Sequence, residues 1–93
     1  MDNAIFQWDD HKAKINLHKH GVDFEEGVTV FNDPLLATMP DAEHSENEQR
    51  FISIGISVKG TVLVIVYTER NEKTRIISCR KATKSEVKFY ENI

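Results

Sequence analysis

The stretch FISIGISVKGTVLVIVYT, residues 51–68, decides the fold. Its first half carries isoleucine at every second position of 52–56, which is the period of a half-buried strand. Lys59–Gly60 predicts a hairpin turn. The second half, 62–68, is apolar on both of its faces, so we expect it to lie at the centre of a sheet.

The residues after this hairpin predict one more strand and a helix. A charged turn at 70–73 leads into a last strand at 74–80. Thr83 is followed three residues later by Glu86, which is the capping-box pattern of a helix start. We expect that helix to continue to Tyr90.

The chain begins with a predicted short strand at 5–8 and a helix. Asp9 can cap the helix because its carboxylate accepts from free N–H groups of the first turn. Gly21 ends it, since glycine adopts the left-handed conformation at little cost. Ala13 and Leu17 are four residues apart, and we expect them to share one helix face, with Trp8 or Ile15 alongside.

A second helix is predicted to begin at Asp23, with Glu26 completing a capping box. Its buried stripe is expected to consist of Phe24, Val28 and Phe31. Residues 32–34 end the helix. An edge strand is then expected at 35–39, followed by an acidic loop at 40–48.

The expected order is therefore β-α-α-β-β-β-β-α in a single domain, residues 1–93. This is a two-layer α+β fold with an antiparallel sheet packed on helices. The composition, 40% hydrophobic and 29% charged, is that of a soluble globular domain. No signal-peptide pattern is visible, and the longest apolar run, 62–67, is far shorter than the roughly 20 residues of a membrane span. A single cysteine excludes an internal disulfide, and we expect a cytoplasmic protein without membrane partners.

Charge divides the chain into two halves. Residues 1–50 carry four Lys/Arg against eleven Asp/Glu, a net of −7, and residues 51–93 carry eight against four, a net of +4. The basic half predicts contact with a polyanion. Two interpretations of the acidic segment 33–48 stay open: a solvated loop, or a docking surface for a basic partner.

Four ordered segments resemble the BrnT toxin family. FQWDDHKAKINLHKHGVDFEEGVTVFNDP at 6–34 resembles the pattern W-D-x-x-K-x-x-x-N-x-x-K-H-G-V-x-F-E-E-A followed by V-F-x-D-P. EQRF at 48–51, VYTER at 66–70 and RIISCRKATKSEVKFY at 75–90 are similar to its remaining segments. Gly27 and Cys79 depart from the pattern, which has alanine at both positions; glycine should weaken the second helix by about 0.5–1 kcal/mol.

The resemblance implies a RelE-like fold and the toxin half of a type II toxin–antitoxin pair. Such a toxin cleaves RNA and thereby inhibits translation and growth. It implies a BrnA-type antitoxin as partner, a DNA-binding protein that neutralises the toxin and alone contacts operator DNA. We expect metal-independent endoribonuclease activity without a cofactor. The alternative is a non-catalytic subunit that binds its partner and acts only in operon repression.

Arginine suits the stabilisation of charge on a scissile phosphate, because its planar fork binds two oxygens and stays protonated. Arg80, which ends the last strand, is the first candidate, and Arg70, which ends the preceding strand, is the second. Since those strand ends lie at opposite ends of a hairpin, Arg50 is the alternative companion for Arg80.

His20 is the candidate acid or base, because its ordinary pKa lies near neutrality. The alternative is structural: a cation in the last turn of a helix interacts favourably with the helix dipole. Glu48 and Glu69 are alternative bases, or they pair with neighbouring arginines. Cys79 is interpreted as a small buried hydrophobe rather than a nucleophile.

Three lysines are candidates for RNA binding: Lys19, Lys81 and Lys84. A cation in the first turn of a helix, as at Lys84, opposes the dipole, and a bound phosphate would relieve this. Trp8 and Tyr90 can either stack on bases or belong to the core, and the core is favoured. The histidine spacing predicts no metal site.

Overall fold

The computed structural model describes residues 5–92. Its elements follow one another as β1 (Phe6–Gln7), α1 (Asp10–His20), α2 (Phe24–Gly27), the 3₁₀ helix η1 (Val28–Asn32), β2 (Ala37–Pro40), the 3₁₀ helix η2 (Ala42–His44), β3 (Arg50–Ile56), β4 (Val62–Arg70), β5 (Lys73–Lys81) and α3 (Lys84–Glu91). The predicted order of helices and strands is confirmed. Among the described residues, no helix is both long and apolar enough to span a membrane.

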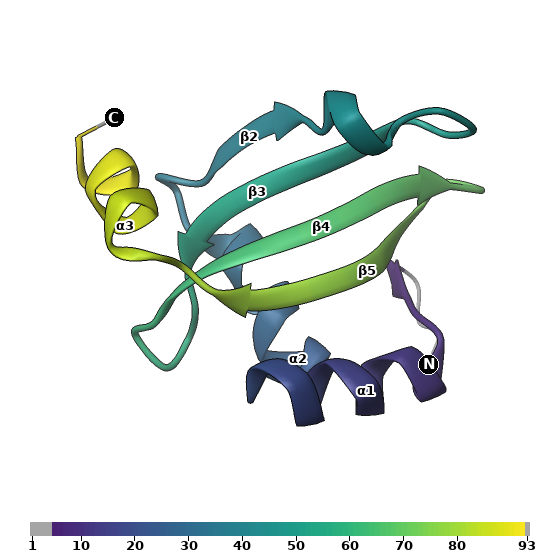
Figure 1. Cartoon of the computed structure of the whole chain (residues 1–93), viewed down its shortest axis with the longest axis horizontal. Coiled ribbons are helices and arrows are strands. Elements are labelled where there is room, and N and C mark those ends of the chain that lie inside the picture. The colour runs from purple at the N-terminus through teal and green to yellow at the C-terminus, as the bar shows by residue number, and fades with distance from the viewer. Residues whose placement is uncertain (1–4, 93) are drawn as a thin grey trace.

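The strands form one sheet in the order β1-β5-β4-β3-β2 (Figure 1). As predicted, β4 lies at the centre and β2 at an edge. Neighbours from β2 to β5 are antiparallel, but β1 pairs with β5 in parallel. The expectation of an antiparallel sheet is therefore wrong at this edge. No hairpin joins β1 to β5, so no turn fixes their relative direction.

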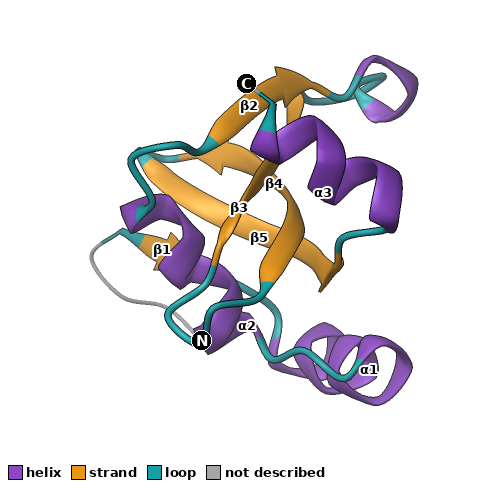
Figure 2. Cartoon of the chain, turned by 90° about the vertical axis from the view of Figure 1, so that its left-hand side faces the viewer, coloured by secondary structure: helices purple, strands orange, loops and turns teal. Residues whose placement is uncertain are grey.

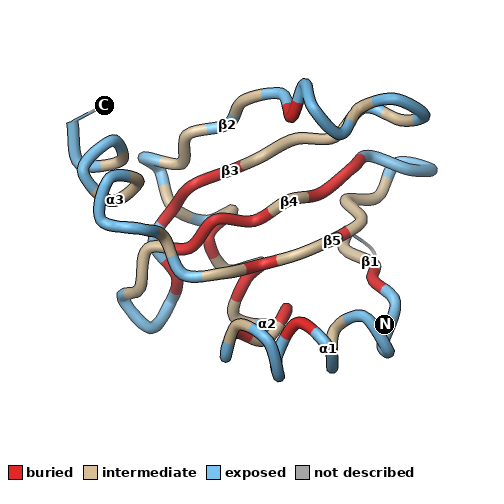
Figure 3. Tube along the Cα trace, viewed as in Figure 1, coloured by how far each residue is buried: buried red, intermediate tan, exposed pale blue. Residues whose placement is uncertain are grey.

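The main core lies between the sheet and the N-terminal helical segments. Figure 3 shows buried backbone along much of β4 and at the inner faces of α1 and α2. The buried cluster comprises Trp8, Val22, Phe24, Val30, Leu63, Ile65, Tyr67, Ile76 and Cys79. Trp8, whose ring meets Phe24 edge-on at 5.7 Å between centroids, is thus a core residue, as favoured from the sequence.

Helix α1 is anchored to the sheet by a polar side chain. Its caps are those expected: Asp9 accepts from the Lys12 N–H, and Gly21 adopts a left-handed φ of 71°. Leu17 is exposed, and the buried residue of α1 is Asn16. The Asn16 amide donates to the carbonyl of Cys79 at 2.8 Å and accepts from its N–H at 3.1 Å. This pair of bonds holds α1 against β5.

The second helix is shorter than expected. α2 ends at Gly27 and the chain continues as η1, with Phe24 and Val30 fully buried. Val28 and Phe31 of the expected stripe pack only partly buried against the core. The tighter 3₁₀ repeat accounts for this change of face, since it places residues three apart on one side.

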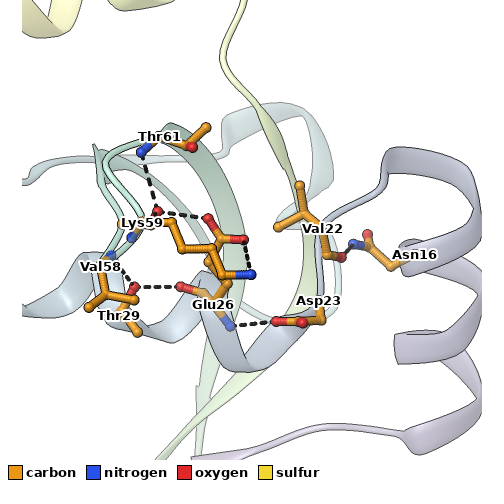
Figure 4. A network of polar contacts seen from close by, with 9 residues as sticks. Asn16, Val22, Asp23, Glu26, Thr29, Val58, Lys59 and Thr61 are labelled. Carbon is orange, nitrogen blue, oxygen red and sulfur yellow. Dashed lines mark hydrogen bonds and ion pairs between the residues drawn. The ribbon is translucent and has the colours of Figure 1, made fainter.

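The expected capping box at Asp23 is only half formed. Asp23 accepts from the Glu26 N–H at 2.6 Å, but the Glu26 carboxylate accepts instead from the Ser57 hydroxyl at 2.7 Å. Thr29 adds a second link, because its hydroxyl accepts from the Val58 N–H at 2.9 Å. Figure 4 shows this network, which fastens α2 and η1 to the hairpin turn between β3 and β4.

Helix α3 is joined to the other face of the sheet. Cys79 faces Gly27 of α2, so the next residue of β5, Arg80, points to the opposite face. There Arg80 binds Glu86 of α3. Figures 1 and 2 show α3 apart from α1 and α2, beside the end of the sheet where β5 ends. The capping box of Thr83 and Glu86 is confirmed.

Candidate functional site

Strand register brings two arginines to one end of the open sheet face. Arg50 on β3 and Arg75 on β5 both pair with Thr68 on β4. Their neighbours Phe51 and Ile76 pack into the core, so the two arginines point to the opposite face. With strands about 4.8 Å apart, their Cα atoms are separated by roughly 10 Å.

A third arginine and a carboxylate complete this cluster. Arg70, at the end of β4, donates to the Glu48 carboxylate at 2.8 Å. That hydrogen bond holds the pKa of Glu48 below its ordinary value, and the charges of Arg70, Arg50 and Arg75 act in the same direction. The charges of three guanidinium groups therefore act on one carboxylate, which is in direct contact with Arg70. We call Arg50, Arg70 and Arg75 the arginine cluster.

The arginine cluster is only partly neutralised. Arg75 donates to a neutral acceptor, Oε1 of Gln7 on β1, at 3.1 Å. The Nε of Arg50 is buried and has no hydrogen-bond partner within residues 5–92. A buried donor without an acceptor is energetically unfavourable, so this N–H is a point of strain in the cluster.

A hollow of about 320 Å³ opens beside the cluster. It is lined by Glu43, His44, Glu46, Asn47, Glu48 and Arg50. These residues come from η2, the loop after it and the first residue of β3. The acidic segment expected as a loop therefore forms one wall of the candidate site.

Hydrogen bonds fix η2 against the start of β3. The Asp41 N–H donates to the carbonyl of Arg50 at 2.9 Å, and the Arg50 N–H donates to Oγ of Ser45 at 3.0 Å. Oγ of Ser45 in turn donates to the carbonyl of Asp41 at 2.5 Å. His44 is placed within this closed turn, and its Nδ1 lies 3.1 Å from the buried carboxylate of Asp41.

Arg80 does not belong to the arginine cluster. It pairs with Val64, whereas Arg75 pairs with Thr68, so five residues of β5, about 17 Å, separate the two arginines. Its guanidinium binds the Glu86 carboxylate through two hydrogen bonds of 2.7 and 2.9 Å. This pairing lowers the pKa of Glu86 from 4.5 to about 2 and raises the pKa of Arg80.

The other predicted site residues also lie at separate places on the molecule. Arg50, expected as the companion of Arg80, lies instead beside the end of β4 and near Arg70, because β3 and β4 run in opposite directions. His20 and Lys19 line a separate hollow between α1 and β5. Lys81 and Lys84 are exposed beside Arg80. Of the four predicted catalytic residues, the structure thus brings together Arg50 and Arg70.

Two residues of the candidate site were not identified from the sequence. Arg75 follows from the register, because a turn at 70–73 pairs Thr68 with Arg75. The sequence signal for His44 is weaker and consists of Asp41, which lies three residues before it in an acidic segment. The favoured assignment of Tyr90 to the core is wrong, because it is half-buried outside the core cluster, where its hydroxyl donates to Asp33 at 2.5 Å.

The fold and the cluster define a small α+β domain with three arginines gathered at one end of its sheet. A sequence model described as "Ribonuclease toxin, BrnT, of type II toxin-antitoxin system" matches residues 8–86. The chain therefore belongs to the BrnT family of ribonuclease toxins. Comparison with curated proteins gives no match.

The fold is similar to that of the Brucella abortus ribonuclease toxin, BrnT, known from a crystal structure. The TM-score is 0.67 at 20% sequence identity, over 87% of this chain and 100% of that chain. At this identity the comparison supports the fold and not the individual site residues.

Proposed function

We propose that the protein is a metal-independent endoribonuclease that cuts RNA at the arginine cluster. The observation that carries this proposal is the placement of Arg50, Arg70 and Arg75 at one end of the open sheet face, where Arg70 contacts the carboxylate of Glu48. A carboxylate and a phosphodiester present similar oxygens to a guanidinium fork. A phosphate that replaces Glu48 meets three permanent positive charges.

These charges supply what cleavage by an adjacent 2′-hydroxyl requires. As the hydroxyl oxygen attacks phosphorus, negative charge grows on the non-bridging oxygens. Preorganised guanidinium groups stabilise that charge, the role that a divalent ion has in metal-dependent nucleases. Arg50, which lines the hollow together with Glu48, is one of the guanidinium groups available for this role.

The remaining cations have a positioning role in this proposal. Arg80, Lys81 and Lys84 lie about 17 Å along the sheet from the cluster, too far to bind the same phosphate. They contact flanking phosphates and carry no base specificity. Lys19, on α1, lines a separate hollow with Ile77 and Ser78 and has the smallest role in RNA binding in this proposal.

Cutting RNA in this way stops translation and growth, and a BrnA-type antitoxin blocks the toxin. Membership of a toxin family implies an antitoxin. The DNA-binding type of that partner and its contact with operator DNA are parts of the proposal. Co-purification with the product of the neighbouring gene, followed by an operator-binding assay with and without that product, tests them.

One observation favours a second candidate, a non-catalytic subunit that binds its partner and acts in operon repression. Arg70 and Arg80, two of the predicted catalytic residues, are each bound to a carboxylate, Glu48 and Glu86. In a binding subunit such pairs remain closed. In an enzyme, the pair at Glu48 opens when RNA binds.

The deciding experiment uses protein freed of its partner, in EDTA, with a defined RNA. We expect cleavage by the wild type and loss of cleavage in Arg50→Ala, with an unchanged melting temperature. Lys88→Ala, which removes an exposed cation of α3, serves as the matched control. Wild-type protein that leaves RNA intact would select the second candidate, and activity that requires a divalent ion would exclude the metal-independent mechanism.

A further inference from the structure

His44 and Asp41 form a paired acid–base group inside the hollow of the candidate site. Nδ1 of His44 lies 3.1 and 3.2 Å from the two oxygens of the Asp41 carboxylate. The Asp41 side chain is 10% exposed and the His44 side chain 61% exposed. Asp41 is thus held inside the turn, and His44 faces the space where RNA would lie.

The Asp41 contact sets the tautomer of the ring. A carboxylate accepts, so Nδ1 of His44 carries the hydrogen in this bond. In the neutral ring the free lone pair is then on Nε2. A nitrogen of this kind can take a proton from a hydroxyl, and the Asp41 carboxylate stabilises the imidazolium that forms.

One member of the arginine cluster, Arg50, lines the same hollow. His44, Glu48 and Arg50 share its lining, and Ser45 fixes η2 to Arg50 through the Arg50 N–H. A phosphate bound by the arginine cluster therefore lies beside His44. His20, the histidine expected from the sequence, lines a different hollow with Ile77 and Ser78.

Glu48 is less suited to take the proton. The hydrogen bond from Arg70 holds its pKa below the ordinary value, which makes it a weaker base. It also occupies the position that the phosphate needs. His44 has neither disadvantage, because its side chain makes no hydrogen bond to a cation within residues 5–92 and its ring nitrogen contacts the Asp41 carboxylate.

We propose that His44, oriented by Asp41, is the general base of RNA cleavage at the arginine cluster. Nε2 removes the proton of the 2′-hydroxyl while O2′ forms its bond to phosphorus and the P–O5′ bond breaks. The leaving O5′ takes a proton from water, and the resulting hydroxide accepts the proton held by His44. The products are a 2′,3′-cyclic phosphate and a free 5′-hydroxyl. This inference rests on the proposed ribonuclease function.

The test compares wild type, His44→Ala and Asp41→Asn in EDTA, with saturating enzyme and a short RNA. We expect His44→Ala to lower the cleavage rate by about 10²–10⁴-fold. Its affinity for the same RNA with 2′-O-methyl groups, which cannot be cut, should change by less than about twofold, since the arginines still bind phosphate. Asp41→Asn should lower the rate by a smaller factor.

Free imidazole provides a readout that a structural role would not give. Added to His44→Ala at tens of millimolar, it should restore part of the cleavage rate and yield the same cyclic-phosphate end. His18→Ala, an exposed histidine of α1, is the matched control and should cut as the wild type does.

Three results would overturn the inference. The first is cleavage by His44→Ala at the rate of the wild type, which leaves the ribonuclease proposal intact. The second is a loss of affinity as large as the loss of rate without imidazole rescue, which makes His44 a binding residue. The third is an inactive wild type, which removes the ribonuclease proposal together with this one.

Discussion

Gly27 and Cys79 lie directly against each other across the interface between α2 and β5. A Cβ atom added at Gly27 would lie 2.9 Å from Sγ of Cys79 and 3.3 Å from its Cβ. Cys79 is fully buried, so the sulfur has no free space to move into. The two departures from the family pattern are therefore one compensated pair: the larger side chain at 79 fits because position 27 has none.

This contact predicts non-additive effects on stability. Gly27→Ala should lower the free energy of unfolding by about 1–3 kcal/mol, because it overpacks the interface. In a Cys79→Ala background the same change should be neutral or stabilising, since alanine is the better helix former. Urea denaturation of the four proteins gives the coupling energy. Additive effects of the two substitutions would contradict the contact.

Burial should also make Cys79 unreactive in the folded protein. Removal from water raises the pKa of its thiol to about 12. The thiolate is the reactive form, so at pH 8 we expect iodoacetamide to modify the folded protein far more slowly than the urea-unfolded chain. Mass spectrometry measures the difference. Equal rates in the two states would show that the thiol is accessible.

The arginine cluster and Arg80 should respond differently to substitution. Arg50→Ala and Arg75→Ala should each lower RNA cleavage by about 10²–10³-fold, as expected when one donor to the developing charge is removed. Arg80→Ala should retain most of the activity and instead lower stability, because it removes the anchor of α3. If Arg80→Ala is inactive with an unchanged melting temperature, the site has been placed at the wrong end of the sheet.

Glu48→Gln distinguishes two roles of that carboxylate. If Glu48 only occupies the phosphate position, its neutralisation should strengthen binding of a non-cleavable RNA by about two- to fivefold. Cleavage should then be kept or increased. Fluorescence anisotropy at fixed salt measures the affinity. Loss of cleavage with intact binding would instead identify Glu48 as the base in place of His44.

The Arg80–Glu86 pair should stabilise the protein in a defined pH range. Arg80 lowers the pKa of Glu86 from 4.5 to about 2 in the folded state, so this contribution is fully present above pH 4.5. It is lost as the pH falls from 4.5 through 2, because the folded state then takes up the proton. Near pH 7, Glu86→Gln should cost about 1 kcal/mol for this partly exposed pair. Denaturation curves of both proteins should converge near pH 2.

Local signals predicted the elements, whereas the tertiary contacts of single polar residues could not be predicted. Asp9, Gly21 and the Thr83–Glu86 box act within one helical turn, so their sequence spacing is sufficient. Asn16 was missed because its bonding partner, Cys79, is 63 residues away in the chain.

In the candidate site, too, the contacts between distant residues could not be predicted from sequence spacing. The sequence correctly placed Arg70 and Arg80 at opposite ends of a hairpin. The prediction that Arg50 accompanies Arg80 failed because the start of β3 lies beside the end of β4. This pairing brings Arg50 to Arg70. Pairing Arg75 with Arg50 requires the register across three strands, and placing His44 requires the closed turn of η2.

The distance along β5 between the two basic ends has a practical consequence. Substitutions more than about 10 Å apart usually act independently. A variant inactivated at Arg50 should thus keep the Arg80–Glu86 anchor of α3. Stabilising changes near Glu86 can then be combined with it, and their effects on the free energy of unfolding should add.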